Sequence, residues 1–200
     1  MLENKYEKLA WKANEKVMGI DEAGRGPLCG PLVVACCVLP KNYKNNEIND
    51  SKKLTDKKRR ELFKIITKDA LYFSIEIVTP KTIDELNILE ATRSAMQKLS
   101  LKYKTDYVLT DAVEIANEKN VPIIKGDAKS ISIAAASILA KVVRDSMMNG
   151  YDILYPEYEY KKHKGYPTKR HIELMNRFGT FNLYRFSYKP VKSCKKVRIF

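Results

Sequence analysis

The chain has 200 residues, 44% of them hydrophobic and 30% charged, and its 37 Lys and Arg against 24 Asp and Glu give a formal charge of +13. This composition excludes a disordered chain and a membrane protein, and the length is typical of one domain with its own core. The longest apolar run, Leu32–Leu39, is too short to cross a bilayer, and the charged segment Met1–Lys16 predicts that no secretory signal is present.

The first half of the chain predicts strands around one helix. Val17–Asp21 has the pattern of a short strand and leads into a Gly-rich turn, whereas Leu32–Leu39 lacks alternation and predicts a strand covered on both faces. Thr55–Lys68 predicts a helix capped by Thr55, and Tyr72–Val78 alternates as a strand does.

The second half predicts helices that alternate with short strands. Thr82–Glu85 has the spacing of a capping box and predicts the start of a long helix that extends towards Tyr103. The remaining elements are predicted as strands over Tyr107–Thr110 and Val121–Lys125, an Ala-rich helix over Ser132–Met148, and a last helix over Lys169–Phe178 with Gly179 as its left-handed C′ residue. This order of elements predicts a mixed sheet in an α/β domain.

The positive charge is concentrated at the end of the chain. Lys161–Phe200 holds twelve Lys and Arg and one acid, so it carries +11, whereas residues 1–160 carry +2. Seven aromatic residues are interleaved with these charges: Tyr166, Phe178, Phe181, Tyr184, Phe186, Tyr188 and Phe200. Basic residues with interleaved aromatics favour a nucleic acid partner over a solubilising tail or a membrane patch. We therefore predict a main domain over residues 1–160 and a basic extension over residues 161–200 that contacts substrate.

The four cysteines, Cys29, Cys36, Cys37 and Cys194, form no C-x-x-C pair, and two of them lie in the most apolar run. This usage predicts buried free thiols in a reducing compartment rather than disulfides or zinc, and hence a cytoplasmic protein.

Acidic residues follow three of the predicted strands. Asp21 and Glu22 end the first, Asp111 follows Tyr107–Thr110, and Asp127 follows the strand at Val121. Side chains at the ends of neighbouring strands can converge, and an oxygen-only donor set suits Mg²⁺ or Mn²⁺. Two such ions about 3.5–4 Å apart are suited to phosphodiester hydrolysis. The alternative is that each acid caps a turn or pairs with a nearby Lys. Because adjacent residues of a regular strand point to opposite faces, Asp21 and Glu22 can share a metal only where the strand breaks or bulges.

Three further segments are candidates for phosphate contacts. Gly24-Arg25-Gly26 allows close backbone approach and a forked Arg contact; its spacing alone favours a plain tight turn, whereas its direct attachment to Asp21 and Glu22 favours a functional role. His163–Thr168 places Tyr166 for stacking beside Lys161, Lys162 and Lys164, or it is a solvated charge run. Asp50–Thr55 offers phosphate contacts or simply starts the following helix. A metal-independent histidine nuclease would have to use His163 and His171, the only histidines in the sequence.

Together these segments resemble the ribonuclease HII family. The matching motifs, in family order, are GIDEAGRGPL (19–28), DSKKL (50–54), IDELNIL (83–89), KGD (125–127), AASILAKVVRD (135–145), YPEY and HKGYPT within 155–168, and RFSYKPV (185–191). The resemblance implies a ribonuclease H-like fold, with a five-stranded mixed sheet flanked by helices and a C-terminal helical extension. It also implies hydrolysis of the RNA strand of RNA–DNA hybrids and incision on the 5′ side of single ribonucleotides in duplex DNA, leaving a 3′-hydroxyl and a 5′-phosphate.

The resemblance also implies roles for individual residues. Two Mg²⁺ or Mn²⁺ ions would be held by Asp21, Glu22, Asp111 and Asp127. Gly24, Arg25 and Gly26 would read the ribose 2′-hydroxyl, and Tyr166 would stack on the neighbouring deoxyribose. Further expected substrate contacts are Ser51, Lys52, Lys53, His163 and Lys164, whereas Asp145 is assigned a structural role. We expect a monomer, and a sliding-clamp interaction remains an open expectation.

The sequence departs from the family at two places. Ala112 stands where the family often has Gly, which affects the turn and not the carboxylate before it, and Tyr184–Tyr188 replaces the frequent His-Arg-Arg-Ser-Phe. The related ribonuclease HIII usually has an extra N-terminal domain, whereas here about eighteen residues precede the first motif and Gly-Arg-Gly is intact. Ribonuclease HII is therefore preferred, and the alternatives are a ribonuclease HIII-like enzyme and a non-catalytic nucleic-acid-binding module.

Overall fold

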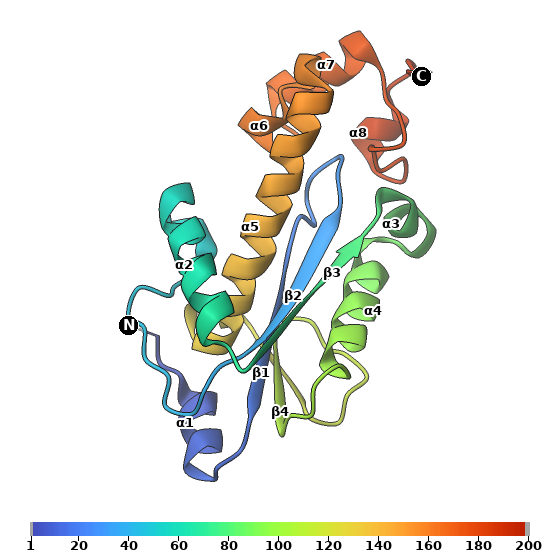
Figure 1. The fold of residues 1–200 in the computed structure, drawn as a ribbon. Coiled ribbons are helices and arrows are strands. Elements are labelled where there is room, and N and C mark those ends of the chain that lie inside the picture. The colour runs from blue at the N-terminus through green and yellow to red at the C-terminus, as the bar shows by residue number, and fades with distance from the viewer. Residues whose placement is uncertain (1, 199–200) are drawn as a thin grey trace. The chain divides into compact units, whose positions relative to one another are not determined.

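A computed structural model describes residues 2–198, and Figure 1 shows its helices and strands. In chain order the elements are α1 (Lys5–Lys12), β1 (Val17–Ala23), β2 (Leu32–Val38), η1 (Ser51–Lys53), α2 (Asp56–Asp69), β3 (Tyr72–Val78), α3 (Pro80–Leu86), α4 (Ile88–Ser100), β4 (Tyr107–Asp111), β5 (Asn120–Ile123), η2 (Gly126–Ala128), α5 (Ile131–Leu154), η3 (Pro156–Tyr158), α6 (Tyr160–His163), α7 (Lys169–Phe178) and α8 (Lys189–Lys192). Among these helices, none combines the length and the hydropathy needed to span a membrane.

The strands form one five-stranded mixed sheet in the order β3-β2-β1-β4-β5. β1 runs antiparallel to β2 and parallel to β4, and β4 runs parallel to β5. Every residue of β2 is buried, as expected for a strand whose apolar residues do not alternate. The predicted mixed sheet is confirmed, and it places the carboxyl ends of β1, β4 and β5 at the same edge.

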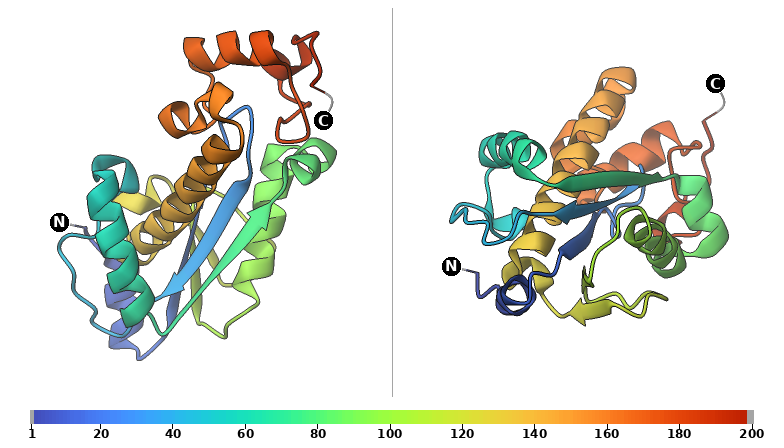
Figure 2. Two further views of the ribbon diagram at one scale, coloured as in Figure 1. Left: turned by 45° about the horizontal axis from the view of Figure 1, so that its top comes forward. Right: turned by 60° about the horizontal axis from the view of Figure 1, so that its bottom comes forward.

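The chain divides into two compact units, which we describe separately. The sheet unit takes in the residues up to Ala23, Val33–Glu76 and Thr92–Val142, and the helical unit takes in Gly24–Leu32, Ile77–Ala91 and the chain from Val143 onward. Within the sheet unit, α2 and the first half of α5 cover one face of the sheet and α4 covers the other (Figure 2). The expected division at residue 160, which concerns function, stays a prediction.

The helix predicted to start at Thr82 is in fact two helices. α3 begins at Pro80, where Thr79 caps it by accepting a hydrogen bond from the Thr82 amide, and it ends before Asn87. Asn87 has a φ of 66° and ψ of 163°, which stops the helix, and its side chain accepts from the amides of Leu89 and Glu90 to start α4. The capping-box prediction was therefore displaced by three residues, because Thr79 precedes a proline that favours the first helical position.

Other helices begin where the sequence predicts or extend beyond the predicted bounds. Thr55 caps α2 as predicted, with its hydroxyl accepting from the Lys58 amide. α5 continues past Met148 to Leu154, and α1 was not predicted. Gly179 ends α7 with a φ of 95° but a ψ of 176°, so it takes a conformation typical of glycine rather than the left-handed helical one.

Most aromatic residues of the basic segment form the core of the helical unit. Phe181 and Tyr184 are buried with Tyr158 and Tyr160, whose rings stack with centroids 5.3 Å apart. Tyr166 and Phe186 are each 42% exposed, and Phe200 lies outside the described residues. The interpretation of the interleaved aromatics as nucleic-acid contacts is therefore wrong for Phe181 and Tyr184.

The cysteines are free thiols, as predicted. Cys29, Cys36 and Cys37 are buried and Cys194 is half-buried. Burial raises the pKa of Cys29 to about 12 and of Cys36 to about 11, so both stay protonated and unreactive at neutral pH.

Candidate active site

Three aspartates of the sheet unit form a carboxylate cluster. Asp21, Asp111 and Asp127 each offer an oxygen within 4.8 Å of the others. Asp21 is 4% exposed and Asp127 5% exposed, while Asp111 is half-buried. The sequence predicted this convergence, and the structure brings all three side chains together; we call them the aspartate cluster.

Strand register explains why these residues meet. Ile20 of β1 pairs with Thr110 of β4, so the next residue of each strand, Asp21 and Asp111, lies at the same carboxyl edge. Asp127 is in η2, just after β5, and Asp111 Oδ1 accepts a 2.7 Å hydrogen bond from the Gly126 amide. That bond ties the end of β4 to the turn that carries the third carboxylate.

The turn after Asp111 requires a left-handed residue. Ala112 has a φ of 56° and its amide donates to the Ile123 carbonyl at 3.1 Å. Glycine adopts this conformation without strain, which agrees with the glycine expected here from the family resemblance. For alanine the left-handed conformation costs about 1–2 kcal/mol. The departure at Ala112 therefore keeps the turn and leaves Asp111 in the cluster.

The electrostatics of the cluster favour protonation or a bound cation. Burial raises the pKa of Asp21 well above its ordinary value, and the charges of Glu22 and Asp111 raise it further. Burial and the charge of Asp111 also raise the pKa of Asp127. Carboxylates this close cannot all stay ionised without a compensating positive charge.

Glu22 lies outside the aspartate cluster. β1 continues without a bulge to Ala23, and its register pairs Asp21 with Ala35 and Glu22 with Val34. Adjacent residues of such a strand point to opposite faces. The metal role that the resemblance implies for Glu22 stays a prediction.

In the DSKKL segment, Ser51 and Lys52 contact the aspartate cluster or its neighbours. Lys52 Nζ is 3.6 Å from Asp127 Oδ2 although the Lys52 side chain is 78% exposed, so its ammonium lies at the rim. Ser51 is buried, and its Oγ lies 2.9 Å from Ser137 Oγ. Lys53 is exposed. Among these residues the structure connects Ser51 and Lys52 to the cluster.

Two neighbours of the cluster were not singled out from the sequence. Ser137 of α5 hydrogen-bonds to Asp21, which lowers the pKa of Asp21 against the larger effect of burial. Asp50 lies beside Asp127 and raises the pKa of Asp127 further, while its Oδ1 caps η1 by accepting from the Lys52 amide. Both belong to motifs that matched the family, AASILAKVVRD and DSKKL, and that membership was the available signal.

The Gly-Arg-Gly loop and Tyr166 lie in the helical unit. Gly24 has a φ of 103°, and a Cβ built on it would lie 2.1 Å from Nε of Arg144. A Cβ on Gly26 would lie 3.6 Å from the Tyr166 ring, and the Arg144 guanidinium is 5.9 Å from the centroid of that ring. The structure therefore brings together Gly24, Gly26 and Tyr166, around a fully buried arginine.

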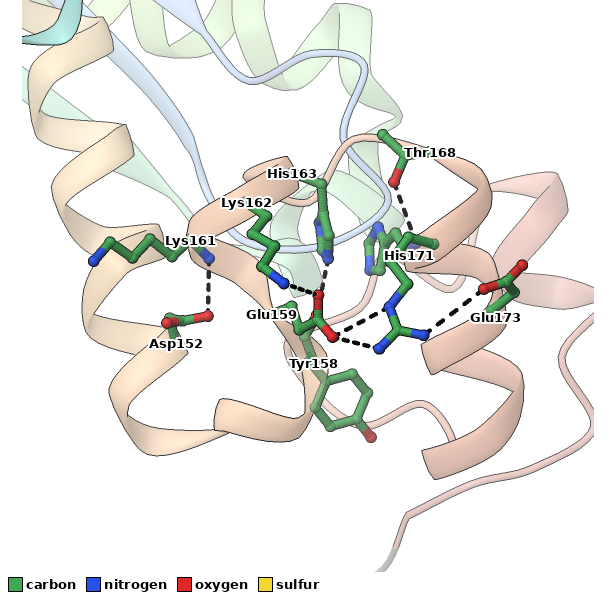
Figure 3. A network of polar contacts seen from close by, with 10 residues as sticks. Asp152, Tyr158, Glu159, Lys161, Lys162, His163, Thr168, His171 and Glu173 are labelled. Atoms are coloured by element: carbon green, nitrogen blue, oxygen red, sulfur yellow. Dashed lines mark hydrogen bonds and ion pairs between the residues drawn. The ribbon is translucent and has the colours of Figure 1, made fainter.

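His163 lies within a network of polar contacts of the helical unit (Figure 3), and Lys164 also makes contacts within this unit. His163 is 8% exposed, its Nδ1 accepts from the Gly165 amide, and its Nε2 lies 2.8 Å from the Tyr158 carbonyl. Its ring stacks on His171 at 4.1 Å between centroids, and burial lowers the pKa of His171 to about 4. Lys164 Nζ donates to Asn149 and to the Lys161 carbonyl. Both ring nitrogens of His163 therefore contact backbone groups, and the substrate contact expected at His163 stays a prediction.

Glu159 anchors the same region. It accepts hydrogen bonds from Lys162 at 2.8 Å and from Arg170, and these bonds lower the pKa of Glu159 to about 2 (Figure 3). Glu159 thus neutralises part of the positive charge of Lys162 and Arg170.

Comparison with known proteins decides the family. The sequence model described as "Ribonuclease HII" matches residues 18–191. The chain belongs to the ribonuclease HII family. The ribonuclease HII of Caldanaerobacter subterraneus subsp. tengcongensis is 52% identical over 176 residues, which cover 86% of this chain and 73% of that protein.

Solved structures agree with this family. The ribonuclease H2 of Pyrococcus horikoshii OT3 has a TM-score of 0.75 and 28% identity, covering 90% of this chain and 97% of that one. The PCNA:RNase HII complex from Archaeoglobus fulgidus has a TM-score of 0.75 and 26% identity, covering 92% and 98%. The ribonuclease HII family and its ribonuclease H fold identify the chain as a metal-dependent endoribonuclease of the ribonuclease H type, as the sequence predicted.

A divalent cation fits the aspartate cluster of this ribonuclease HII. Its donors are hard carboxylate oxygens within 4.8 Å of one another, and burial together with the neighbouring carboxylates raises the pKa of Asp21 and Asp127, so a cation would offset the charge of the ionised groups. Both Mg²⁺ and Mn²⁺ satisfy these conditions.

We expect divalent metal to stabilise the protein more at pH 8 than at pH 5. Without metal, a raised aspartate pKa favours the folded state only in the protonated form, so that contribution is lost as pH rises through the folded pKa of Asp21 and Asp127. A metal replaces those protons, and at a hundred times its Kd it adds about 2.7 kcal/mol, or roughly 5–10 °C in Tm. Melting curves with EDTA and with MnCl₂ at the two pH values measure the increment; equal increments at both would contradict it.

Proposed function

We propose that this chain hydrolyses the RNA strand of RNA–DNA hybrids and incises duplex DNA on the 5′ side of a single embedded ribonucleotide, leaving a 3′-hydroxyl and a 5′-phosphate. The observation that carries the proposal is the buried aspartate cluster at the carboxyl edge of the sheet, in a chain whose charge is +13. Such a cluster binds cations, whereas the chain as a whole attracts a polyanion.

The cluster is the proposed catalytic centre. Asp21, Asp111 and Asp127 would hold Mg²⁺ or Mn²⁺, with Glu22 as the further ligand that the family resemblance implies. Two bound cations supply activation of the attacking water and stabilisation of the leaving 3′-oxygen. Ser137 orients Asp21 through its hydrogen bond, and Lys52 offsets negative charge at Asp127.

Recognition of the ribonucleotide is proposed for the helical unit. The loop Gly24–Gly26 presents backbone to the 2′-hydroxyl, which distinguishes RNA from DNA, and the exposed Tyr166 ring stacks on the neighbouring sugar. The other proposed substrate contacts are Ser51, Lys52, Lys53, His163 and Lys164. The mainly basic chain from Lys161 onward adds affinity with little sequence preference.

One gel tests the function. A labelled duplex with one ribonucleotide, an all-DNA duplex and a long hybrid are incubated with the enzyme in Mg²⁺, Mn²⁺ or EDTA. Metal-dependent nicking 5′ of the ribonucleotide is the expected result. Binding without nicking would identify a nucleic-acid-binding module, and cutting in EDTA that is lost in His163→Ala would identify a histidine nuclease.

We expect Tyr166→Ala to reduce cleavage at a single ribonucleotide more than it reduces duplex affinity. Stacking on one ring contributes about 1–3 kcal/mol, or roughly 5- to 150-fold in cleavage efficiency, while the lysines that bind phosphates are untouched. Single-turnover cleavage and filter binding of the same duplex measure the two quantities. Tyr43→Ala in the sheet unit is the matched control, and equal losses in both measurements for Tyr166→Ala would refute the stacking role.

The compartment, oligomeric state and protein partner of this chain are also proposed. Free buried thiols favour the cytoplasm, and we expect a monomer. A sliding-clamp partner stays a prediction, supported by the relative solved in a complex with PCNA.

A further inference from the structure

A second buried arginine holds the backbone of the Gly-Arg-Gly loop. Arg185 is 0% exposed, and its guanidinium donates to the carbonyls of Gly24 at 2.7 Å, Arg25 at 3.0 Å and Gly30 at 2.9 Å. Burial lowers the pKa of Arg185, because removing the guanidinium cation from water costs free energy. A single planar fork that binds three carbonyls of one loop defines the conformation of that loop.

The fork also determines where the loop amides point. All peptide bonds of the described residues are trans, and in a trans peptide the N–H points opposite to the C=O. The Gly24 carbonyl shares its peptide with the Arg25 amide, and the Arg25 carbonyl shares its peptide with the Gly26 amide. With both carbonyls turned onto Arg185, these two amides point away from the guanidinium.

Tyr188 contributes a second donor to the same loop. Its hydroxyl donates to the Arg25 carbonyl at 2.6 Å and accepts from Arg185 Nη1 at 3.1 Å. Arg185 and Tyr188 therefore both bind the Arg25 carbonyl of the loop.

The segment that carries Arg185 is itself anchored. The Arg185 amide donates to the Leu28 carbonyl at 2.9 Å, and the Gly30 amide donates to the Leu183 carbonyl at 2.8 Å. Beyond Arg185, the Asp84 carboxylate of α3 accepts from the amides of Phe186 and Ser187, both at 2.8 Å. Three parts of the helical unit thus fix the guanidinium against the loop.

We propose that Arg185 is a positioning residue for recognition of the ribonucleotide, with the Tyr188 hydroxyl as its partner and Asp84 as its anchor. It holds the peptides of Gly24–Gly26 so that their amides face the substrate 2′-hydroxyl. The proposal rests on the proposed function and assigns a discrimination role to residues outside the loop.

The test measures discrimination rather than activity alone. In an Asp21→Asn background, in which the duplex stays intact, the Kd of an all-DNA duplex is divided by the Kd of the same duplex with one ribonucleotide. We expect Arg185→Lys to lower this ratio by about 10- to 100-fold, because one ammonium cannot span three carbonyls and small displacements of a binding group are costly. We expect Tyr188→Phe to lower it by about three- to tenfold, the effect of one hydrogen bond.

The matched control is Tyr184→Phe. It removes a hydroxyl from the same segment, but that hydroxyl contacts His171 and not the loop, so the ratio should stay within about twofold of the parent. Affinity for the all-DNA duplex and Mn²⁺ binding are measured in each variant well below its Tm. Asp84→Asn should fall between Arg185→Lys and the control.

The outcomes separate the two proposals. If the parent shows no preference for the ribonucleotide and the wild-type chain does not nick, the proposed function fails. If the parent discriminates and both Arg185→Lys and Tyr188→Phe retain its ratio, the function stands and the positioning role is overturned. If Arg185→Lys does not fold, the positioning role is decided by comparing the Kd ratio of Tyr188→Phe with that of Tyr184→Phe.

Discussion

The Asp21→Asn protein is expected to lose cleavage by at least about 10³-fold, the equivalent of several kcal/mol of transition-state stabilisation, while it still binds an RNA–DNA hybrid. Asp21 is the most buried member of the aspartate cluster, and asparagine matches its shape while removing its charge. Affinity for the hybrid should stay the same or rise, because one negative charge facing the phosphates is gone. Metal-free stability should also rise, because the cost of burying the Asp21 carboxylate and its repulsion from Glu22 and Asp111, which together raise the pKa of Asp21, are removed.

Single-turnover cleavage, hybrid binding and metal-free melting measure these three effects together. Asp69→Asn is the matched control, since Asp69 accepts a hydrogen bond from the Tyr43 hydroxyl at 2.9 Å and lies outside the cluster. Unchanged turnover in Asp21→Asn would remove Asp21 from the catalytic centre. Loss of turnover together with loss of hybrid binding would indicate misfolding instead.

The acids of the cluster were predictable because their placement depends on local rules. Apolar strands that end in aspartate, in a parallel arrangement, bring those side chains to one edge whatever the rest of the chain does. The rule that separates adjacent strand residues also accounts for the position of Glu22 outside the aspartate cluster in a strand without a bulge, and its metal role stays a prediction. Ser137 follows no such rule, because its contact with Asp21 depends on how α5 packs on the sheet.

The helical unit was less predictable, because its contacts depend on tertiary packing rather than on local rules. Part of its core consists of tyrosine and phenylalanine side chains that lie among lysines in the sequence, so composition alone does not identify them as core residues. His163 belongs to the HKGYPT motif, and motif membership alone does not separate a residue that touches substrate from one that supports Tyr166. Arg185 was visible in the sequence as a motif residue, but its bonds to Gly24 and Gly30 span more than 150 positions and follow only from the tertiary structure.

Replacing Gly19 with alanine is expected to destabilise the fold by about 3 kcal/mol or more, at the upper end of what overpacking costs. A Cβ on Gly19 would lie 2.1 Å from the Ser132 carbonyl carbon and 2.4 Å from the Ile133 amide nitrogen. These are backbone atoms of the first turn of α5, so no side-chain rotation relieves the contact and the helix itself must move.

Gly150→Ala makes the same chemical change in α5 with the opposite expected sign. Apart from its chain neighbours and the nearby backbone of its own helix, a Cβ there meets no described atom within 4 Å, so the variant should gain about 0.5–1 kcal/mol from the higher helix propensity of alanine. Gly19 and Asp21 lie on the same face of β1, two residues apart, and α5 carries Ser137 to Asp21. Displacing α5 from Gly19 therefore also weakens Mn²⁺ binding at the cluster, which titration of the folded protein measures separately from urea unfolding. A Gly19→Ala protein as stable as Gly150→Ala would mean that α5 does not rest on β1 at this glycine.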